Sequence, residues 1–401
     1  MNDSAPPLPS IVASRRLSSI DVYRGFVMFL LLAEALQFAK IAEAFPNSGF
    51  WHFLARHQEH VDWVGCTLHD LIQPSFSFLV GVALPFSVAA RLGRGHSRTQ
   101  LIGHALWRAL LLIFIGIALR SAWSTQTYWT FEDTLTQIGL GYPLLFLIGL
   151  CPPRWTWPAL AVILLGYWAA WALYPLPPAG FDFTQVGVPA DWPHHATGFA
   201  AHWNKNANFG NAFDQWFLNL FPRLKPFTAN GGGYLTLSFI PTLGTMILGL
   251  IAGRILRRDQ ESGDRVKQLL LAGLACLVAG LIAHVTGLCP IVKRIWTPSW
   301  TLFSGGWCFF LLASFYAAVD IAGWKRWAFP LQVIGMNSIA AYFMSWLFHE
   351  PLVTQLKIHF GVRPFAIFGD AFVPLLLGVA ILAIEWSILF WMYRRKLFLK
   401  I

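Results

Sequence analysis

The chain has 401 residues, of which 56% are hydrophobic and only 12% are charged. A soluble domain carries about 25% charged residues, so this chain lacks the charge to cover a water-exposed surface. The composition excludes a soluble enzyme, a disordered protein and a small disulfide-stabilised domain, and it indicates a polytopic membrane protein. The net charge of +10 comes from Lys and Arg in short segments between apolar runs, which favours membrane orientation over nucleic-acid binding.

Ten apolar runs are candidates for membrane-spanning helices, each of which needs about 20 residues. The runs lack the period-two alternation of β-barrel strands, so the expected fold is an all-α polytopic membrane helix bundle. The weakest of them is the short run at 135–151. The ten runs cover approximately 20–42, 71–90, 101–120, 135–151, 156–174, 234–253, 267–285, 300–319, 329–348 and 371–392.

The placement of Lys and Arg predicts that both termini lie in the cytoplasm. With a cytoplasmic tail at residues 1–19, the inner segments hold most of the 29 basic residues. Residues 20–401 then form one transmembrane domain with a long outer loop at about 175–233. That loop is rich in aromatic residues and Asn, which suits either a polyhydroxylated ligand or a cap at the membrane interface.

The N-terminus has a competing interpretation as a cleaved signal peptide. Arg15 and Arg16 precede an apolar run and a small-residue site at 33–35. We disfavour cleavage because the apolar run continues beyond this site. In addition, Asp21 and Arg24 lie where the apolar region of a signal peptide would begin.

Asp21 and Arg24 open the first predicted span and share one helix face, so we expect them to pair. The helix dipole favours an acidic residue at this end, but it does not account for Arg24. An arginine at the inner mouth of the bundle suits a phosphate-bearing ligand from the cytoplasm. Arg108, in the first turns of the third span, either joins this site or extends its charge to the membrane surface.

Two carboxyl groups lie inside predicted spans, where ionisable side chains cost free energy and are functional candidates. Glu34 lies about 21 Å along the first span, in its outer half, and we expect it to take part in the function. Glu385 lies nearer the cytoplasm in the last span. We therefore expect that the two do not meet and that Glu385 forms a hydrogen bond to a neighbouring helix.

The outer segment 57–74, before the second span, is the richest in acid–base groups. Histidine suits proton transfer near neutral pH, and a nearby carboxylate can orient it. Composition alone does not identify which histidine acts, and a polar interfacial loop is the alternative. A metal site at His60, Asp62, His69 and Asp70 matches no established ligand spacing, so we expect no metal.

Two further polar features leave alternatives open. Asn337 and Ser338, near the inner third of the ninth span, either line a cavity or bridge neighbouring helices. The five Cys form no metal motif. Cys66 and Cys289 both lie on the predicted outer face, so the sequence leaves open whether they form a disulfide.

Five short motifs, in the same order along the chain, resemble those of the heparan-alpha-glucosaminide N-acetyltransferase catalytic-domain family. They are Ile-Asp-Val-Tyr-Arg-Gly at 20–25, His-Val-Asp-Trp-Val-Gly at 60–65, Asp-Leu-Ile-Gln-Pro-Ser-Phe at 70–76, Trp-Thr-Pro-Ser-Trp at 296–300 and Gly-Met-Asn-Ser-Ile at 335–339. The matches run from about residue 15 to the C-terminus.

The resemblance implies a multi-span acetyltransferase that binds acetyl-CoA from the cytosol and acetylates a glucosamine amine on the far side. The family's catalytic histidine falls on His60. The chain departs from the family pattern at Glu34, near the place of an asparagine implicated in the site, and at Ser345, where the family enzyme has a histidine. The large lumenal domain of the animal enzyme has no counterpart, so we expect a bacterial relative, in the inner membrane, with its own acceptor.

The residues and the resemblance together predict an acetyl-CoA-dependent acyltransferase. His60 is expected to act at the outer mouth as a general base or as an acetyl-carrying nucleophile, with Glu34 and Asp70 as partners. The residues expected to bind acetyl-CoA are Asp21, Arg24, Arg108, Asn337 and Ser338.

Two other classes of function compete with this interpretation. A transporter or flippase for a glycan or lipid-linked sugar would use Glu34 and Glu385 as coupling groups, and a non-catalytic membrane component would use its polar residues only to hold helices together. The expected partners of the acyltransferase are acetyl-CoA, a sugar or glycan acceptor and the lipid bilayer, with no nucleic acid. The acceptor's identity and a homodimer stay open.

Overall fold

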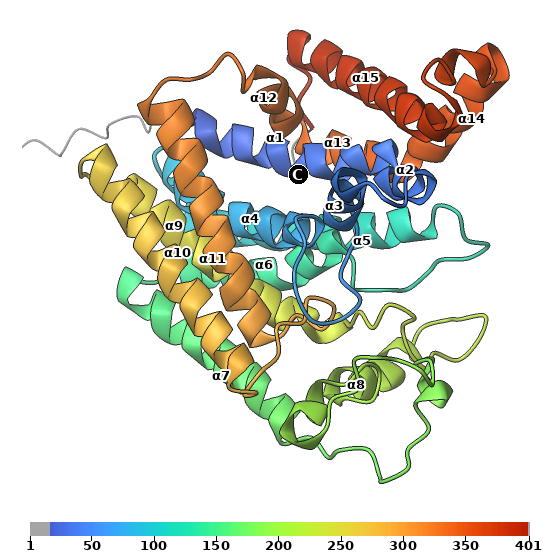
Figure 1. Cartoon of the computed structure of the whole chain (residues 1–401). Coiled ribbons are helices and arrows are strands. Elements are labelled where there is room, and N and C mark those ends of the chain that lie inside the picture. The colour runs from blue at the N-terminus through green and yellow to red at the C-terminus, as the bar shows by residue number, and fades with distance from the viewer. Residues whose placement is uncertain (1–16, 400–401) are drawn as a thin grey trace, which may run out of the picture.

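The protein is all-helical in a computed structural model that describes residues 17–399. Within that range the β-type pairing is a single bridge between Val64 and Val292. Most of the predicted tail at 1–19, including Arg15 and Arg16, lies outside the described residues. Figure 1 shows the long helices packed against one another, with the loop-rich region around the short helix α8 at one end.

Fifteen α-helices follow one another between residues 17 and 399. Several are extended by short 3-10 or π turns, such as η1 at Ala33–Leu36 and η2 at His69–Leu71. The helices are α1 Ser18–Leu32, α2 Phe38–Ala44, α3 Gly49–Gln58, α4 Ile72–Leu92, α5 Arg98–Ser121, α6 Thr134–Leu150, α7 Thr156–Ala172, α8 Phe209–Leu218, α9 Phe239–Arg257, α10 Ser262–Val285, α11 Pro298–Phe315, α12 Phe329–Met336, α13 Ser338–Leu347, α14 His349–Phe360 and α15 Val373–Arg394.

Six helices of the described chain are long and apolar enough to cross a membrane, and each covers one of the predicted runs. With their end turns they are His69–Leu92, Arg98–Ser121, Thr236–Arg257, Ser262–Val285, Pro298–Ile321 and Asp370–Arg394. A seventh candidate is the first run, where Ser18–Leu36 and Phe38–Ala44 are bent by 41°. The bend follows from Gln37, which adopts a left-handed backbone conformation with φ 48°.

The other three predicted runs are shorter or interrupted. α6 and α7 have 17 residues each, and the run at 329–348 divides into α12 and α13 at Asn337. Apolar content alone therefore did not reveal where these helices end. The described residues support an all-helical membrane protein with six clear spans.

The first span packs directly on α12 through two glycines. A Cβ atom on Gly25 would lie 1.7 Å from the carbonyl oxygen of Leu331, and one on Gly335 would lie 1.8 Å from that of Asp21. Any side chain at these positions would collide with the facing backbone. The absence of a Cβ is thus what allows α1 and α12 to touch.

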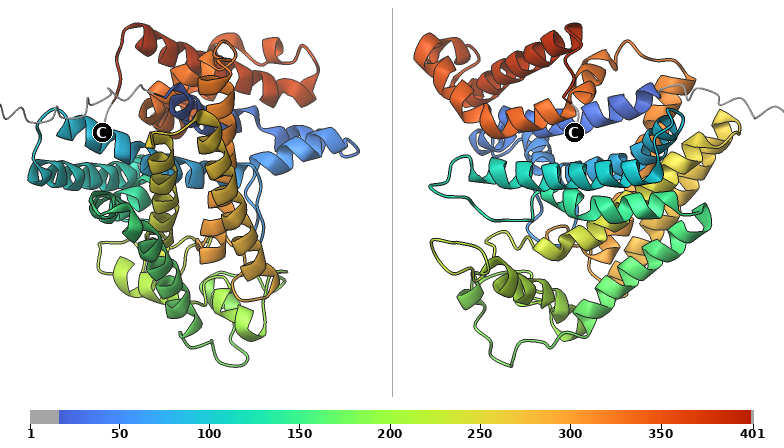
Figure 2. Two further views of the ribbon diagram at one scale, coloured as in Figure 1. Left: turned by 90° about the vertical axis from the view of Figure 1, so that its left-hand side faces the viewer. Right: turned by 180° about the vertical axis from the view of Figure 1, so that it is seen from behind.

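The predicted outer loop is an ordered cap. It contains α8 and two 3-10 turns, and its buried Asn side chains bond to its own backbone: Asn206 donates to the Val186 and Asn230 carbonyls, at 2.9 and 3.0 Å. Trp63 Nε1 donates to the Trp203 carbonyl at 3.2 Å and ties this cap to the segment before α4. These contacts favour the cap over the ligand-binding interpretation. In both views of Figure 2 the cap lies at the end opposite α14 and α15.

Candidate active site

The segment between α3 and α4 brings His60 and Asp70 into contact. His60 Nδ1 lies 2.8 Å from Asp70 Oδ1. The Asp70 side chain is fully buried, and its Oδ2 accepts from the backbone N–H and the hydroxyl of Thr67, at 2.9 and 3.0 Å. Asp70 is fixed by these bonds and by its place in the turn that begins the second span, where the helix dipole favours a carboxylate. It can therefore hold His60 in one orientation.

Lys293 completes this cluster, and sequence reasoning missed it. Its Nζ lies 3.6 Å from Asp70 Oδ1, and 3.0 and 3.2 Å from the Nδ1 and Nε2 atoms of His60. Lys293 comes from the loop between α10 and α11. That loop is joined to the His60 segment by the Val64–Val292 bridge. The side chain is almost completely buried, so the cluster pairs a buried cation with a buried anion.

Burial sets the protonation states of the cluster. It lowers the pKa of His60 to about 4, although the hydrogen bond to Asp70 acts in the opposite direction. Burial also lowers the pKa of Lys293 to about 8, opposed by the attraction of Asp70. At pH 7 the imidazole is therefore neutral and Lys293 is mostly protonated. Because Asp70 accepts the proton on Nδ1, the lone pair of His60 lies on Nε2, where it can act as a base or a nucleophile.

His60 and Lys293 line a cavity of about 200 Å³ among the helices. Its other wall carries a second polar group that the sequence did not single out. Arg120 Nε donates to Asp133 Oδ2 at 3.3 Å, and the Tyr342 hydroxyl donates to Asp133 Oδ1 at 2.9 Å. These three residues come from α5, the N-terminal cap of α6 and α13, so they hold three elements around the cavity.

His69 connects Glu34 to this cluster. His69 Nε2 lies 3.2 Å from Glu34 Oε1, and the ring centres of His69 and His60 are 4.4 Å apart. The Glu34 side chain is 49% exposed and lines the same cavity as His60. The three residues predicted as catalytic, His60, Glu34 and Asp70, thus lie at one place.

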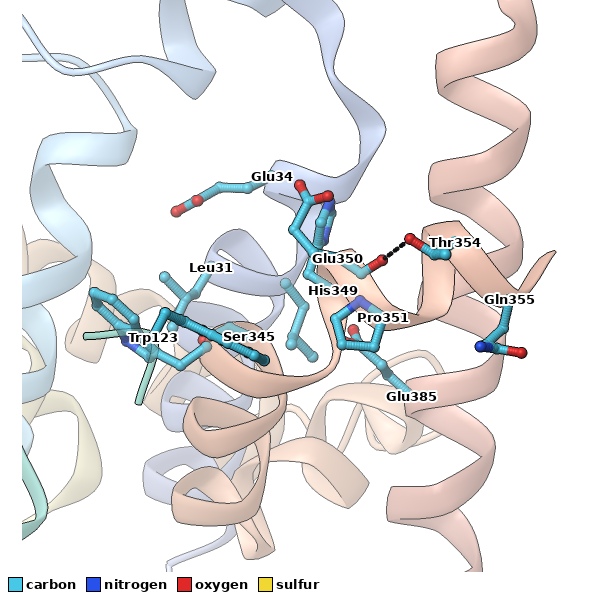
Figure 3. A pocket seen from close by; sticks show the side chains of 12 residues that line it. Leu31, Glu34, Trp123, Ser345, His349, Glu350, Pro351, Thr354, Gln355 and Glu385 are labelled. Atoms are coloured by element: carbon cyan, nitrogen blue, oxygen red, sulfur yellow. Dashed lines mark hydrogen bonds between the residues drawn. The ribbon is translucent and has the colours of Figure 1, made fainter. Parts of the chain in front are cut away.

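Glu385 faces a cavity that Glu34 also lines, and our expectation that the two carboxyl groups do not meet stays a prediction. This second cavity has a volume of about 610 Å³ and lies between the first span and α13, α14 and α15 (Figure 3). A Cβ atom on Gly378 would lie 2.1 Å from the Ala35 carbonyl oxygen, so α15 packs against the turn that carries Glu34. Glu385 follows Gly378 by about two helical turns, or roughly 10 Å along the helix axis.

The residues predicted to bind acetyl-CoA lie elsewhere, and none of them is among the described residues that line these two cavities. Arg24 Nη1 pairs with Asp21 at 3.3 Å, which confirms the predicted pair. Arg108 Nη1 donates to the Tyr142 hydroxyl at 3.1 Å, and its guanidinium lies over that ring. The binding roles of these residues stay predictions.

Asn337 and Ser338 lie at the break between α12 and α13. Asn337 Nδ2 donates to the Leu397 carbonyl at 3.0 Å, and its Oδ1 accepts from the Leu399 N–H at 3.2 Å. The Asn337 side chain is completely buried. The bonds favour the bridging interpretation, because they hold the C-terminal segment in place.

The cysteines form no disulfide in residues 17–399, and the acidic groups there form no metal site. Cys66 and Cys289 are both free thiols. Within residues 17–399, no group of three or more His, Cys, Asp and Glu side chains is arranged to hold a metal ion.

Two mammalian proteins are similar in sequence to most of this chain. No family model matches the chain. The heparan-alpha-glucosaminide N-acetyltransferase of Homo sapiens is 26% identical over 390 residues, covering 86% of this chain and 54% of that protein. The Mus musculus protein of the same name is 25% identical over 437 residues, covering 97% of this chain and 61% of that protein.

The chain thus spans between about half and three-fifths of the length of these relatives. Both alignments nevertheless cover most of the chain itself. Together with the five motifs in family order, they support the membership of this chain in the heparan-alpha-glucosaminide N-acetyltransferase family.

Proposed function

We propose that this protein is an integral membrane acyltransferase that moves an acetyl group from cytosolic acetyl-CoA to an amino sugar or other glycan acceptor at the outer face. The observation that carries the proposal is the cluster of His60, Asp70 and Lys293, of which His60 and Lys293 line a cavity among the helices. The relatives' name, N-acetyltransferase, supports the reaction class.

The cluster can assist acyl transfer in two ways. In the first, His60 Nε2 takes a proton from the acceptor group as that group attacks the thioester carbonyl; the C–S bond then breaks, and the CoA thiolate leaves with the proton that His60 returns. In the second, Nε2 attacks the carbonyl itself and the C–S bond breaks to release the CoA thiolate. The acceptor then attacks the acetyl-imidazole, the acetyl–nitrogen bond breaks, and the acceptor's proton passes to the departing imidazole or to the thiolate. Asp70 stabilises the positive charge that the ring gains on either route. The Lys293 ammonium can stabilise the negative oxygen that forms as the carbonyl is attacked.

The proposal includes the membrane arrangement expected from the sequence. Ten crossings with both termini inside require α6, α7 and the pair α12–α13 to count as spans, the last of them interrupted at Asn337. Clusters of Arg at the C-terminal ends of α9 and α15, such as Arg257 and Arg394, support an inner location for those ends. The location that goes with this proposal is the inner membrane of a bacterial cell.

The test begins with acetyl-CoA binding to the purified protein in detergent. We expect Arg24→Ala to weaken binding at least tenfold, because a guanidinium that contacts phosphate contributes about 1.5–3 kcal/mol. Arg98→Ala is the matched control, since Arg98 is an exposed cation at the start of α5. Equal binding by all three proteins would contradict the predicted donor site.

The second step tests His60 directly. His60→Ala should abolish transfer of radiolabelled acetyl from acetyl-CoA to amine and glycan acceptors, while Arg98→Ala should retain it. Recovery of acetyl-His60 after rapid quenching would select the covalent route. Transfer at the wild-type rate by His60→Ala would rule out both routes.

The transporter or flippase remains the second candidate, and one observation favours it. Glu34 and Glu385 line one large cavity, as coupling carboxylates of a transporter would. A transporter releases its substrate unmodified and needs no acetyl-CoA. Uptake or flipping of a glycan without acetylation, in vesicles that hold the purified protein, would support it.

A further inference from the structure

The cavity of about 610 Å³ adjoins the His60 cavity, and most of the residues that line it have no role in the proposed acetyl transfer. Leu31, Glu34 and Trp346 line both cavities. A ligand in the larger cavity therefore lies next to the wall that Glu34 and His69 form with the cluster. Figure 3 shows that side chains from the first span, α13, α14 and α15 surround the larger cavity.

The larger cavity has an excess of negative charge. Glu34, Glu350 and Glu385 line it together with His349, and the described lining residues include neither Lys nor Arg. Glu34 already pairs with His69, so Glu350 and Glu385 are the carboxyl groups left to attract a positively charged ligand.

Glu385 is an independent observation that points to ligand binding in this cavity. Its side chain is 1% exposed, and its Oε1 atom has no hydrogen-bond partner among the described residues. Figure 3 shows the side chain reaching from α15 toward α14 near Pro351. An unpaired buried oxygen costs free energy, which a ligand that donates a hydrogen bond would recover.

The side chains around this cavity suit a small ligand that has both an apolar face and hydroxyl groups. Trp123 and Trp346 line it, and indole rings stack on flat apolar faces and on cations. The guanidinium of Arg120 already lies over the Trp346 ring, 4.7 Å from its centre, so Trp123 is the indole left to stack on a ligand. Ser345 and Gln355 add groups that can bond to hydroxyls.

We propose that this cavity binds the primary ammonium group of an amine-bearing ligand, with Glu385 as its buried carboxyl partner and Glu34 at the boundary with the His60 cavity. The inference rests on the proposed function, because it makes the cavity the place where an amine acceptor binds before transfer. An amino sugar and an ethanolamine lipid headgroup both carry this chemistry, and the experiment separates them.

The first measurement is calorimetric binding of glucosamine without acetyl-CoA, with N-acetylglucosamine as the neutral probe. We expect wild-type protein to prefer glucosamine at least tenfold and Glu385→Gln to lose that preference. Glu43→Gln is the matched control, because Glu43 is an exposed carboxyl on α2 outside the cavity. Retention of the preference by Glu385→Gln would overturn the proposal.

A second measurement does not depend on how the variant folds. Wild-type protein is treated with a hydrophobic carbodiimide, and labelling of Glu385 is read by mass spectrometry. Protection by glucosamine identifies a sugar ligand, whereas protection in bilayers of phosphatidylethanolamine but not phosphatidylcholine identifies a lipid. Absence of protection by either amine would overturn the proposal.

The same samples keep this inference separate from the proposed function. Acetyl-CoA binding and transfer are measured beside amine binding. Amine binding that depends on Glu385, without any acetyl transfer, would support the site and reject the acyltransferase. Acetyl transfer to an amine acceptor that Glu385→Gln leaves unchanged would do the reverse.

Discussion

Replacing Asp70 with Asn tests the central cluster, because it changes one charge and little volume. Asp70 Oδ1 lies 3.6 Å from Lys293 Nζ and 2.8 Å from His60 Nδ1. At an effective dielectric constant of 20, the charges of Asp70 and Lys293 at 3.6 Å attract each other by about 4–5 kcal/mol. Part of this attraction offsets the desolvation of both groups. Removing the charge leaves burial of Lys293 unopposed, so the pKa of Lys293 should fall below about 8.

The same change also disturbs His60. An amide at position 70 can place its NH₂ group against Nδ1, which favours the wrong tautomer and leaves Nε2 protonated. In a Ser-His-Asp triad this kind of change lowers kcat by about 10⁴-fold. We expect a loss of about 10³-fold in acetyl transfer for Asp70→Asn, and a loss of about 3 kcal/mol or less in stability.

The assay is transfer of radiolabelled acetyl from acetyl-CoA, with acetyl-CoA binding and thermal unfolding measured on the same preparations. Asp62→Asn is the matched control, because Asp62 is exposed in the same segment. A folded Asp70→Asn protein that transfers acetyl within threefold of the wild type would refute the reasoning about the cluster.

Three further predictions follow from the same structure. The rate of acetyl transfer should rise as the pH passes about 4, where His60 loses its proton, and fall above about 8, where Lys293 loses its proton. Lys293→Arg should remove the fall at alkaline pH, and an unchanged pH–rate profile in this variant would contradict the role of Lys293. Gly25→Ala should lower stability by about 1–3 kcal/mol, because the new methyl group collides with α12. Gly103→Ala is the control, because a Cβ atom there meets nothing within 4 Å. Equal melting temperatures for the two variants would count against the close packing of α1 on α12. Asn337→Leu should lower the free energy of unfolding by about 1–3 kcal/mol and expose the C-terminal segment to protease, because it leaves buried backbone groups unpaired. Unchanged proteolysis would show that other contacts hold this segment.

Local sequence located the segment that holds the histidine and its carboxylate, and the family resemblance selected His60 within it. His60 and Asp70 lie ten residues apart, so one polar segment before one span contained both. Lys293 lies 233 residues from His60, and no local pattern joins them. A signal was present nonetheless: Lys293 and Arg294 interrupt the apolar stretch from Ile291 to Trp296, and a lysine is rarely buried without a partner.

The cavity that Glu34 and Glu385 share is not visible in the sequence, for a geometric reason. Hydropathy treats both helices as straight and fully crossing. The first span instead turns at Gln37, and α15 packs by Gly378 against the turn before that bend. Backbone contacts of this kind depend on the tertiary structure, which hydropathy does not describe.

The contact between α1 and α12 has a consequence for how the protein is made. Gly25 leaves the ribosome roughly 300 residues before Gly335, and synthesis at about 5–20 residues per second spreads the two over tens of seconds. During that interval α1 depends on earlier partners, such as α4, where Ser75 accepts a hydrogen bond from the Tyr23 hydroxyl at 2.8 Å. The first helix to be made, α1, thus gains its full packing only when α12, one of the last, has been made. A nascent chain that ends before α12 would leave Gly25 of α1 without the helix that packs against it.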